Sequence, residues 1–463
     1  MRIFIKPKGL RRDDRDQSSW CAVCDHLVNT KAYDTIDGLR DHFLSPKIFS
    51  PEDRIMESHD VRSSQAIDFE RIPEMEDKWR KEITAMTVTL QDKRKAIQND
   101  EILRGVHPKS HGCLDAEFTV NRDIAPQFQV GLFAQPGKCF RARIRYSNAD
   151  VLKRADLEKG QDATGARFLN HGSRGMAIKV LDVGAPVLLE DGCARNQDFL
   201  MVNTPEFAFR NVRDYLRLTK ALCASADGAD PLLFFLPGEL LKRGMMDMSG
   251  SLLPAPAGEP PQNAGLRALF EANRAFFDDF DAEDMQGVIS AAGVVGKIQS
   301  TPVRNPLFAP YFSAASFRFG KDRVMRFSVV PLQSEEMAAD MASDAFEDFS
   351  DDYLSQALAL SVATNEPIKL SFRIQIAHEE DIVNDIDGMI ENAAKTWDED
   401  QFSHTEVAQI TINPPCPSAE LVDTCKPLLF TPWHAVVDFE PLGGINRLRK
   451  PVYSTSAAFR RSV

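Results

Sequence analysis

Short runs of alternating apolar and polar residues dominate the chain between residues 104 and 210. A period of two puts every second side chain on the same face of a strand. The pattern predicts strands at 116–120, 140–147, 175–181 and 199–205, with turns rich in Gly and Pro between them. It predicts further strands at 315–319, 324–330, 368–376 and 407–412. Many short strands at such spacing are typical of an antiparallel barrel or sandwich.

Helical spacing of apolar residues occurs in several other parts of the chain. It predicts helices at 66–103, 212–224, 265–280 and 335–363, the last of them strongly acidic. At the C-terminal end, a helix would place Arg449 and Tyr453 on one face, because residues four apart lie on the same side. Arg460 would fall close to the same line two turns later. The predicted fold class is therefore α+β.

Composition and charge narrow the function classes. The chain has 463 residues, of which 43% are hydrophobic and 27% charged, as in ordinary globular proteins. A net charge of -13 argues against nucleic acid as a partner. The apolar run at 231–237 is too short for a membrane span. Charged residues at 11–14 interrupt any signal-peptide pattern, and eight scattered cysteines indicate no disulfide framework, so we expect a cytoplasmic protein.

Residues 1–65 are polar and irregular, and they predict an N-terminal extension separate from a domain at 66–463. Cys21 and Cys24 are spaced as zinc ligands are, with His26 and His42 nearby. A second His at zinc-finger spacing after His42 is missing. Two interpretations therefore stay open for this segment, a zinc site and a loose extension, of which the sequence favours the extension.

The C-terminal Tyr and Arg residues suggest a ligand strap. A phenol beside a fixed guanidinium is more readily ionised, because the opposite charge lowers its pKa. Tyrosinate is one of the protein ligands used for haem iron. The alternative is an exposed basic helix with an incidental Tyr. On the strand at 140–147, Arg141, Arg143 and Arg145 share a face, which favours an anionic partner there.

Five motifs resemble those of the haem catalase superfamily, especially its shorter catalase-related branch. They occur in the family's order and span residues 104–463, with a divergent middle. The motifs are Arg-Gly-Val-His at 104–107, Arg-Ile-Arg-Tyr-Ser at 143–147, Ser-Arg-Gly-Met-Ala-Ile-Lys at 173–179, Asn-Thr-Pro-Glu-Phe at 203–207, and Arg-Lys-Pro-Val-Tyr at 449–453 with Arg460. The resemblance implies a catalase-like antiparallel β-barrel core with surrounding helices, and haem b as cofactor.

The resemblance also implies a role for individual residues. Tyr453 would be the proximal iron ligand, Arg449 would keep it ionised, and His107, preceded by Val106, would be the distal base. Ser147 would orient that base, Asn203 would bind peroxide, and Tyr215 would lie over the haem. Asn203 fits only if the strand end is shifted by one residue, because Val202 stands where the long catalases carry the catalytic Asn. The residues expected to bind the haem propionates are Arg104, Arg145 and Arg460.

These residues imply an oxidoreductase of catalase or peroxidase type that acts on hydrogen peroxide or an organic hydroperoxide. An alternative within the superfamily is a haem enzyme that rearranges fatty-acid hydroperoxides, as allene oxide synthases do. Val106 favours hydrogen peroxide, since that branch has Thr before the distal His. Ala457 stands where the long catalases carry a His. A third alternative is a haem-binding protein without enzymatic activity. A homo-oligomer is possible, and His111 is a rival to His107 as the distal base.

Overall fold

The structure is a computed structural model. It describes residues 68–161, 167–190, 192, 194–332, 349–363, 366–413 and 425–462. The chain divides into two units, Met1–Asp60 and Val61–Val463, and all the described residues belong to the second. The predicted extension at 1–65, including Cys21 and Cys24, lies outside the described residues. So does most of the acidic part of the helix predicted at 335–363.

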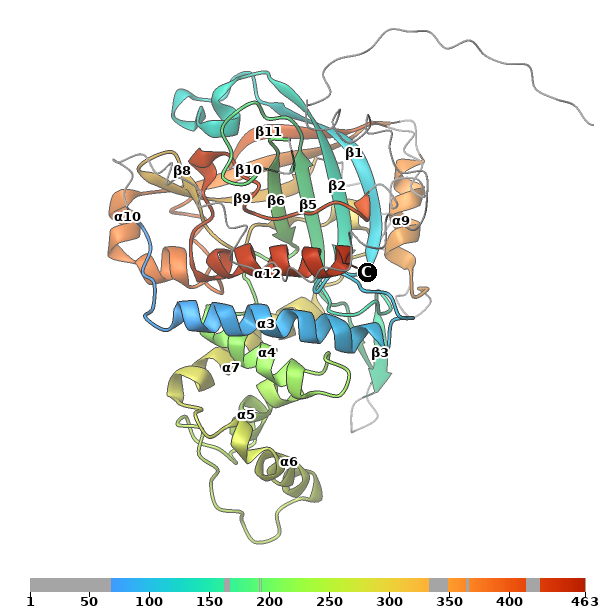
Figure 1. Cartoon of the computed structure of the whole chain (residues 1–463), viewed down its shortest axis with the longest axis vertical. Coiled ribbons are helices and arrows are strands. Elements are labelled where there is room, and N and C mark those ends of the chain that lie inside the picture. The colour runs from blue at the N-terminus through green and yellow to red at the C-terminus, as the bar shows by residue number, and fades with distance from the viewer. Residues whose placement is uncertain are drawn as a thin grey trace, which may run out of the picture. The chain divides into compact units, whose positions relative to one another are not determined.

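Antiparallel strands close into a barrel, as the sequence pattern predicted (Figure 1). Within the described residues the hydrogen-bonded ring runs β10-β11-β1-β2-β5-β6-β7-β9 and returns from β9 to β10. The short strand β8 (Phe317–Phe319) also pairs with β9. The strands of the ring are β1 (Ser110–Val120), β2 (Cys139–Asn148), β5 (Arg174–Val180), β6 (Gln197–Val202), β7 (Tyr311–Phe312), β9 (Arg323–Pro331), β10 (Ile368–His378) and β11 (Thr405–Ile412).

Aromatic side chains fill the barrel. Phe199 and Phe372 have ring centroids 4.6 Å apart, and Phe118 lies 5.2 Å from Phe372 in an edge-to-face arrangement. All three rings are almost completely buried. The alternation of β2 directs Phe140, Ala142, Ile144 and Tyr146 to this core and the intervening side chains outward. The barrel interior is therefore packed, and a ligand site has to lie on the outer face.

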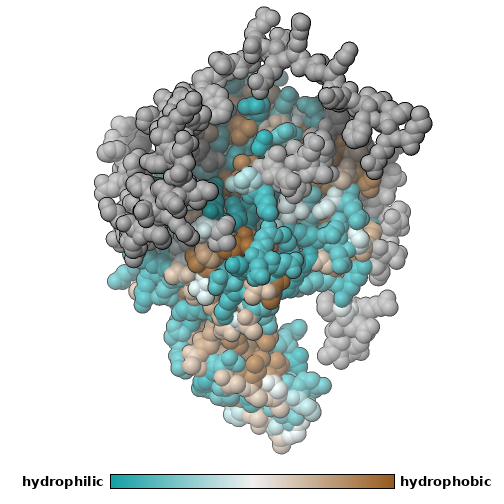
Figure 2. Space-filling model, turned by 45° about the vertical axis from the view of Figure 1, so that its right-hand side comes forward, coloured by the Kyte–Doolittle hydropathy of each residue, from teal (hydrophilic) through white to brown (hydrophobic). Residues whose placement is uncertain are grey.

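Helices cover part of the outer face of the barrel. The long helices α3 (Glu76–Lys95) and α12 (Gly444–Arg461) run side by side next to β2, β5 and β6, with α4 (Val212–Ala224) packed against α3 (Figure 1). A further helical part has its own apolar core and consists of α5 (Leu232–Lys242), α6 (Pro261–Ala272) and α7 (Ala282–Ser300). Figure 2 shows apolar residues at the surface of this lower part.

The remaining elements are short. Strands β3 (Glu158–Gln161) and β4 (Arg167–Asn170) form a separate hairpin sheet. Helix α9 (Tyr353–Val362) packs on β1, and α10 (Glu379–Asn384) follows β10. The single-turn elements are η2 (Pro126–Phe128), η3 (Gly131–Ala134), η4 (Arg274–Phe276), η5 (Pro306–Phe308), η7 (Asp387–Glu391) and η8 (Val437–Phe439). Within the described part of the chain, no helix is long and apolar enough to cross a membrane.

Arg447 fixes α12 against α3. Its guanidinium nitrogens lie 2.7 and 2.6 Å from the carboxylate oxygens of Glu76, and one nitrogen lies 2.8 Å from Glu391. Glu70 is a third carboxylate partner. These hydrogen bonds and charges raise the pKa of Arg447 despite its burial. Three carboxylates around one guanidinium thus orient the helix that carries Tyr453.

Candidate active site

The candidate site is a cavity of about 490 Å³ against the outer face of the barrel, between β2, β5 and β6 on one side and α3, α4 and α12 on the other. Its volume falls within the range of pockets for small molecules and cofactors. Every residue predicted for the site except Asn203 lines it. These residues are Arg104, Val106, His107, Arg145, Ser147, Tyr215, Arg449, Tyr453 and Arg460.

His107 is held at this cavity by its main chain and its ring. Its φ of +62° lies in the left-handed region, which is uncommon for residues other than Gly. Its amide donates to the carbonyl of Asp150 at 2.9 Å, and its carbonyl accepts from Arg145 Nη2 at 2.9 Å. The ring Nδ1 lies 3.0 Å from Ser147 Oγ. The unusual backbone conformation is therefore stabilised by bonds on both sides.

Nε2 is the ring nitrogen of His107 left facing the cavity. It makes no hydrogen bond to the described part of the chain, and it is accessible from the cavity. Burial, together with the nearby charges of Arg145, Arg449 and Arg104, lowers the pKa of His107 to about 3. The imidazole is therefore neutral at physiological pH and can accept a proton from a ligand.

Gly175 makes room for the His107 ring, a role that sequence reasoning missed. A Cβ at this position would overlap Nδ1 and Cε1 of the ring and would lie 3.0 Å from Ser147 Oγ. Gly175 is on β5 and pairs with Ser147 on β2. The motif containing Gly175 was recognised in the sequence, but only the cross-strand register reveals the contact with His107.

Three arginines stand at the cavity without a carboxylate, of which Arg145 is buried and Arg104 and Arg460 are partly buried. No ion pair joins Arg104, Arg145 or Arg460 to an acidic residue among the described residues. Burial and then repulsion from Arg145 and Arg460 lower the pKa of Arg104 to about 8. Burial and then Arg460 lower that of Arg145 to about 10. Nη2 of Arg460 is buried without a hydrogen-bond partner. Such a cluster favours an anionic ligand.

The three arginines of β2 share one face, as predicted, but only one of them reaches the cavity. Arg141 and Arg143 do lie on the outer face, but both are near solvent. Arg143 pairs with Asp115 at 3.2 Å, and Arg141 lies 3.9 Å from Asp182. Arg145 alone of the three lines the cavity. Strand alternation gave the correct face, but it could not show where along the strand solvent ends and the cavity begins.

Helix α12 brings Tyr453 and Arg449 to the cavity together. Arg449 donates to Asn446 Oδ1 at 3.1 Å, and its guanidinium lies 5.2 Å from the ring centroid of Phe207. Tyr215 on α4 stands close to Tyr453. Burial first and then Tyr453 raise the pKa of Tyr215, whereas Arg94 and Arg449 lower it. Ionisation of Tyr453 by Arg449 stays a prediction.

The structure does not place Asn203 among the lining residues, although it is buried. Its Oδ1 accepts from the amide of Arg174 at 2.7 Å, and its Nδ2 is buried without a partner. Val202, the preceding residue, lines the cavity instead. No contact with the cavity therefore supports the predicted catalytic role of Asn203. The shift of one residue that this role would require is not seen, because Val202 occupies the position at the cavity.

The rival base His111 lies away from the cavity lining. Its Nε2 is 2.8 Å from Asn148 Oδ1, and its Nδ1 is 3.4 Å from Ser355 Oγ. Burial lowers its pKa to about 4, while Asp156 acts in the opposite direction. Both ring nitrogens are engaged in a buried network, so His111 has no nitrogen free for a ligand in the cavity.

Apolar side chains from the helical part extend the lining beyond the predicted residues. They come from the segment before α4 and from α4, α5 and α7: Phe209, Leu218, Leu222, Phe235, Val295 and Ile298. The sequence analysis predicted none of them. Helix α7 itself was not predicted, so its contribution to the cavity could not be foreseen.

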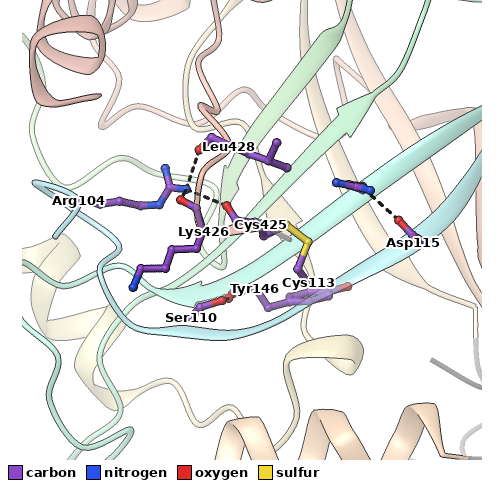
Figure 3. The surroundings of a disulfide bond; sticks show 9 residues. Arg104, Ser110, Cys113, Asp115, Tyr146, Cys425, Lys426 and Leu428 are labelled. Carbon is purple, nitrogen blue, oxygen red and sulfur yellow. Dashed lines mark hydrogen bonds and ion pairs between the residues drawn. A yellow bond between two sulfur atoms is a disulfide. The ribbon is translucent and has the colours of Figure 1, made fainter. Parts of the chain in front are cut away.

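A disulfide joins Cys113 on β1 to Cys425, the first residue described after 413 (Figure 3). The two residues are 312 positions apart in the chain. The sequence analysis expected no disulfide framework and did not foresee this bond. Cys139 and Cys223 are free. Within the described residues, no group of three or more His, Cys, Asp or Glu is arranged to hold a metal ion.

Comparison with known proteins gave matches among solved structures alone. No family model matches the chain, and no curated protein matches it. A fungal catalase matches with 17% identity and a TM-score of 0.48, over 77% of this chain and 59% of that chain. A bacterial catalase matches with 15% identity and a TM-score of 0.46, over 77% of this chain and 57% of that chain. Catalase A from Saccharomyces cerevisiae matches with 17% identity and a TM-score of 0.48, over 77% of this chain and 60% of that chain.

This chain thus spans less than two thirds of the length of the solved catalases that it matches.

Proposed function

We propose that the protein is a haem-dependent oxidoreductase of catalase or peroxidase type, with Tyr453 as proximal ligand and His107 as distal base. One observation supports it above the others. A tyrosine and a neutral histidine from distant parts of the chain line one cavity that also holds three arginines without carboxylate partners. A phenol, an imidazole and unpaired cations are the groups that a haem with two propionates requires.

The residues present fit haem. Tyr453 would hold the iron, and Arg104, Arg145 and Arg460 would bind the propionates, for which the unpaired Nη2 of Arg460 is a ready donor. When bound, haem supplies the redox-active iron at which a peroxide O–O bond is cleaved. Tyr215 lines the same cavity and would contribute an aromatic surface to the haem.

His107 would move the proton. Because its pKa is about 3, the ring is neutral at neutral pH. With Nδ1–H donating to Ser147 Oγ, Nε2 would carry the free lone pair and take the proton from one peroxide oxygen. The same nitrogen can return that proton to the departing oxygen. Ser147 holds the opposite side of the ring at Nδ1, so Nε2 keeps one orientation during both transfers.

A second candidate substrate class is organic hydroperoxides. The observation that favours it is the apolar wall from α4, α5 and α7, since hydrogen peroxide needs no such surface. Hydrogen peroxide and a fatty-acid hydroperoxide can be compared on the same haem-loaded protein. Oxygen release from hydrogen peroxide supports the catalase reaction, whereas faster loss of the fatty-acid hydroperoxide supports the second class.

The proposed base is tested by replacing each of the two histidines. His107→Ala should retain haem but lose peroxide cleavage by about 100-fold or more, because general acid–base catalysis contributes roughly that much. His111→Ala is the matched control and should retain the cleavage rate. The measurement is loss of peroxide after rapid mixing with the haem-loaded protein. Loss of activity in His111→Ala alone would contradict the assignment of the base.

A further inference from the structure

The segment 425–430 forms the wall at the arginine end of the cavity. Leu429 and Phe430 line the cavity directly. Arg104 Nη2 donates to the carbonyls of Leu428 at 2.7 Å, Cys425 at 3.2 Å and Lys426 at 3.4 Å (Figure 3). Its guanidinium also lies 6.0 Å from the ring centroid of Phe430. The position of Arg104 thus depends on where this segment lies.

The other end of the disulfide is next to Arg145. Cys113 on β1 pairs in register with Arg145 on β2. Directly opposite residues of an antiparallel pair project to the same face and are close neighbours. Arg145 in turn donates to the carbonyl of His107. One covalent bond therefore connects the segment that binds Arg104 to the strand neighbour of Arg145.

We propose that the Cys113–Cys425 disulfide is a clamp that positions Arg104 and Arg145 for the anionic groups of the ligand in this cavity. The bond fixes segment 425–430 on the outer face of β1 and β2, where its carbonyls hold Arg104. Without the bond the segment can move away from β1, and Arg104 and Arg145 lose their fixed separation. The anionic groups meant here are the haem propionates, so the proposal rests on the proposed function.

Burial determines how the clamp responds to reductants. Cys113 and Cys425 are 0% and 1% exposed, so a thiol reagent reaches them only after local opening. Reduction takes two electrons and two protons and converts the S–S bond into two thiols. A dithiol reagent supplies both as it forms its own cyclic disulfide. We expect slow reduction of the native protein, with loss of anion binding following it.

The test begins with the state of the cysteines. Alkylation of the denatured protein, followed by mass spectrometry, should label Cys113 and Cys425 only after reduction. The free cysteines Cys139 and Cys223 should be labelled without it. Labelling of Cys113 and Cys425 in the unreduced protein would overturn the proposal.

The function of the clamp is measured with a Cys113→Ala/Cys425→Ala double variant and with Cys139→Ser as the matched control. Haem titrated into the double variant should bind about 10-fold or more weakly, as expected when charge-assisted hydrogen bonds lose their positions. The control should bind as wild type does. Reduction of the native wild-type protein by a dithiol provides the same comparison without substitution, in case the double variant does not fold.

Hydrogen exchange separates the clamp from the proposed function. In the haem-free protein, backbone amides of 425–430 should exchange faster in the double variant, or after reduction, than in wild type. Equal exchange, or equal haem affinity with the disulfide removed, would overturn the clamp. Wild-type protein that takes up no haem would count against the proposed function alone, and exchange at 425–430 would then decide on the clamp.

Discussion

Replacing Gly175 with Ala should disable the proposed base while leaving the fold intact. The backbone of Gly175 does not require positive φ, so the effect of the added methyl group is steric. That group would overlap the Nδ1 and Cε1 edge of His107. The main chain of His107 cannot retreat easily, because its amide and carbonyl are bonded to Asp150 and Arg145. The ring therefore has to rotate and give up its 3.0 Å contact with Ser147.

Two magnitudes follow from this geometry. Overpacking a buried site costs about 1–3 kcal/mol of unfolding free energy, which this chain should tolerate. Displacing a catalytic group by about 1 Å costs on the order of 100-fold in rate, and loss of general-base function costs about as much or more. We therefore expect Gly175→Ala to bind haem with unchanged affinity and to cleave peroxide about 100-fold more slowly.

The assay is rapid mixing of the haem-loaded variant with peroxide, alongside a haem titration and a thermal unfolding curve. Gly293→Ala is the matched control, because Gly293 lies on α7 with no atom within 4 Å of its added Cβ. That variant should be as active as wild type and somewhat more stable, as Ala is the better helix former. Unchanged peroxide cleavage in Gly175→Ala would refute the contact between Gly175 and the base as a functional constraint.

Three further predictions concern stability and anion binding. Arg447→Met should lower the unfolding free energy by about 3–5 kcal/mol in urea titrations, because it leaves three carboxylates without their cation, and a loss under 1 kcal/mol would contradict this. His107 and His111 have folded pKa values of about 3 and 4, so the unfolded state binds more protons below pH 6.5. Stability should therefore fall as pH drops from 6.5 to 4, by up to about 1.4 kcal/mol per pH unit for each His, with a smaller slope in His111→Asn. Arg460→Gln should weaken haem binding about 10-fold without destabilising the haem-free protein, since it removes a partly buried guanidinium whose Nη2 has no hydrogen-bond partner; a drop in haem-free stability without loss of affinity would oppose this.

Periodicity predicted many elements of the fold, and its failures have physical causes. The strand predicted at 116–120 begins earlier in the structure, at Ser110. Its first part was missed because a bulge and the residues His111 and Gly112 interrupt the alternating pattern there. Helix α4 was predicted with its observed bounds, and Asn211 caps it by accepting from the amide of Asp214. Helix α7 was not predicted, since small residues and glycines leave its apolar stripe weak.

The candidate site likewise contains residues that the sequence predicted and contacts that it could not predict. The resemblance named Tyr453, His107 and the arginines, and the fold brings them to one cavity. Contacts that depend on how distant segments align could not be predicted from the sequence. Gly175 beside the His107 ring and the bond between Cys113 and Cys425 are the two examples. The choice between His107 and His111 likewise needed the tertiary contacts of each ring.

The most direct test of the central claim is the absorption spectrum of the purified protein titrated with ferric haem, compared with that of Tyr453→Phe. We expect saturable uptake by wild type with a high-spin ferric spectrum typical of tyrosinate ligation. Tyr453→Phe, which keeps the ring but removes the oxygen ligand, should lose that spectrum. Identical spectra for the two proteins would contradict Tyr453 as the ligand, and no uptake by wild type would contradict the haem site itself.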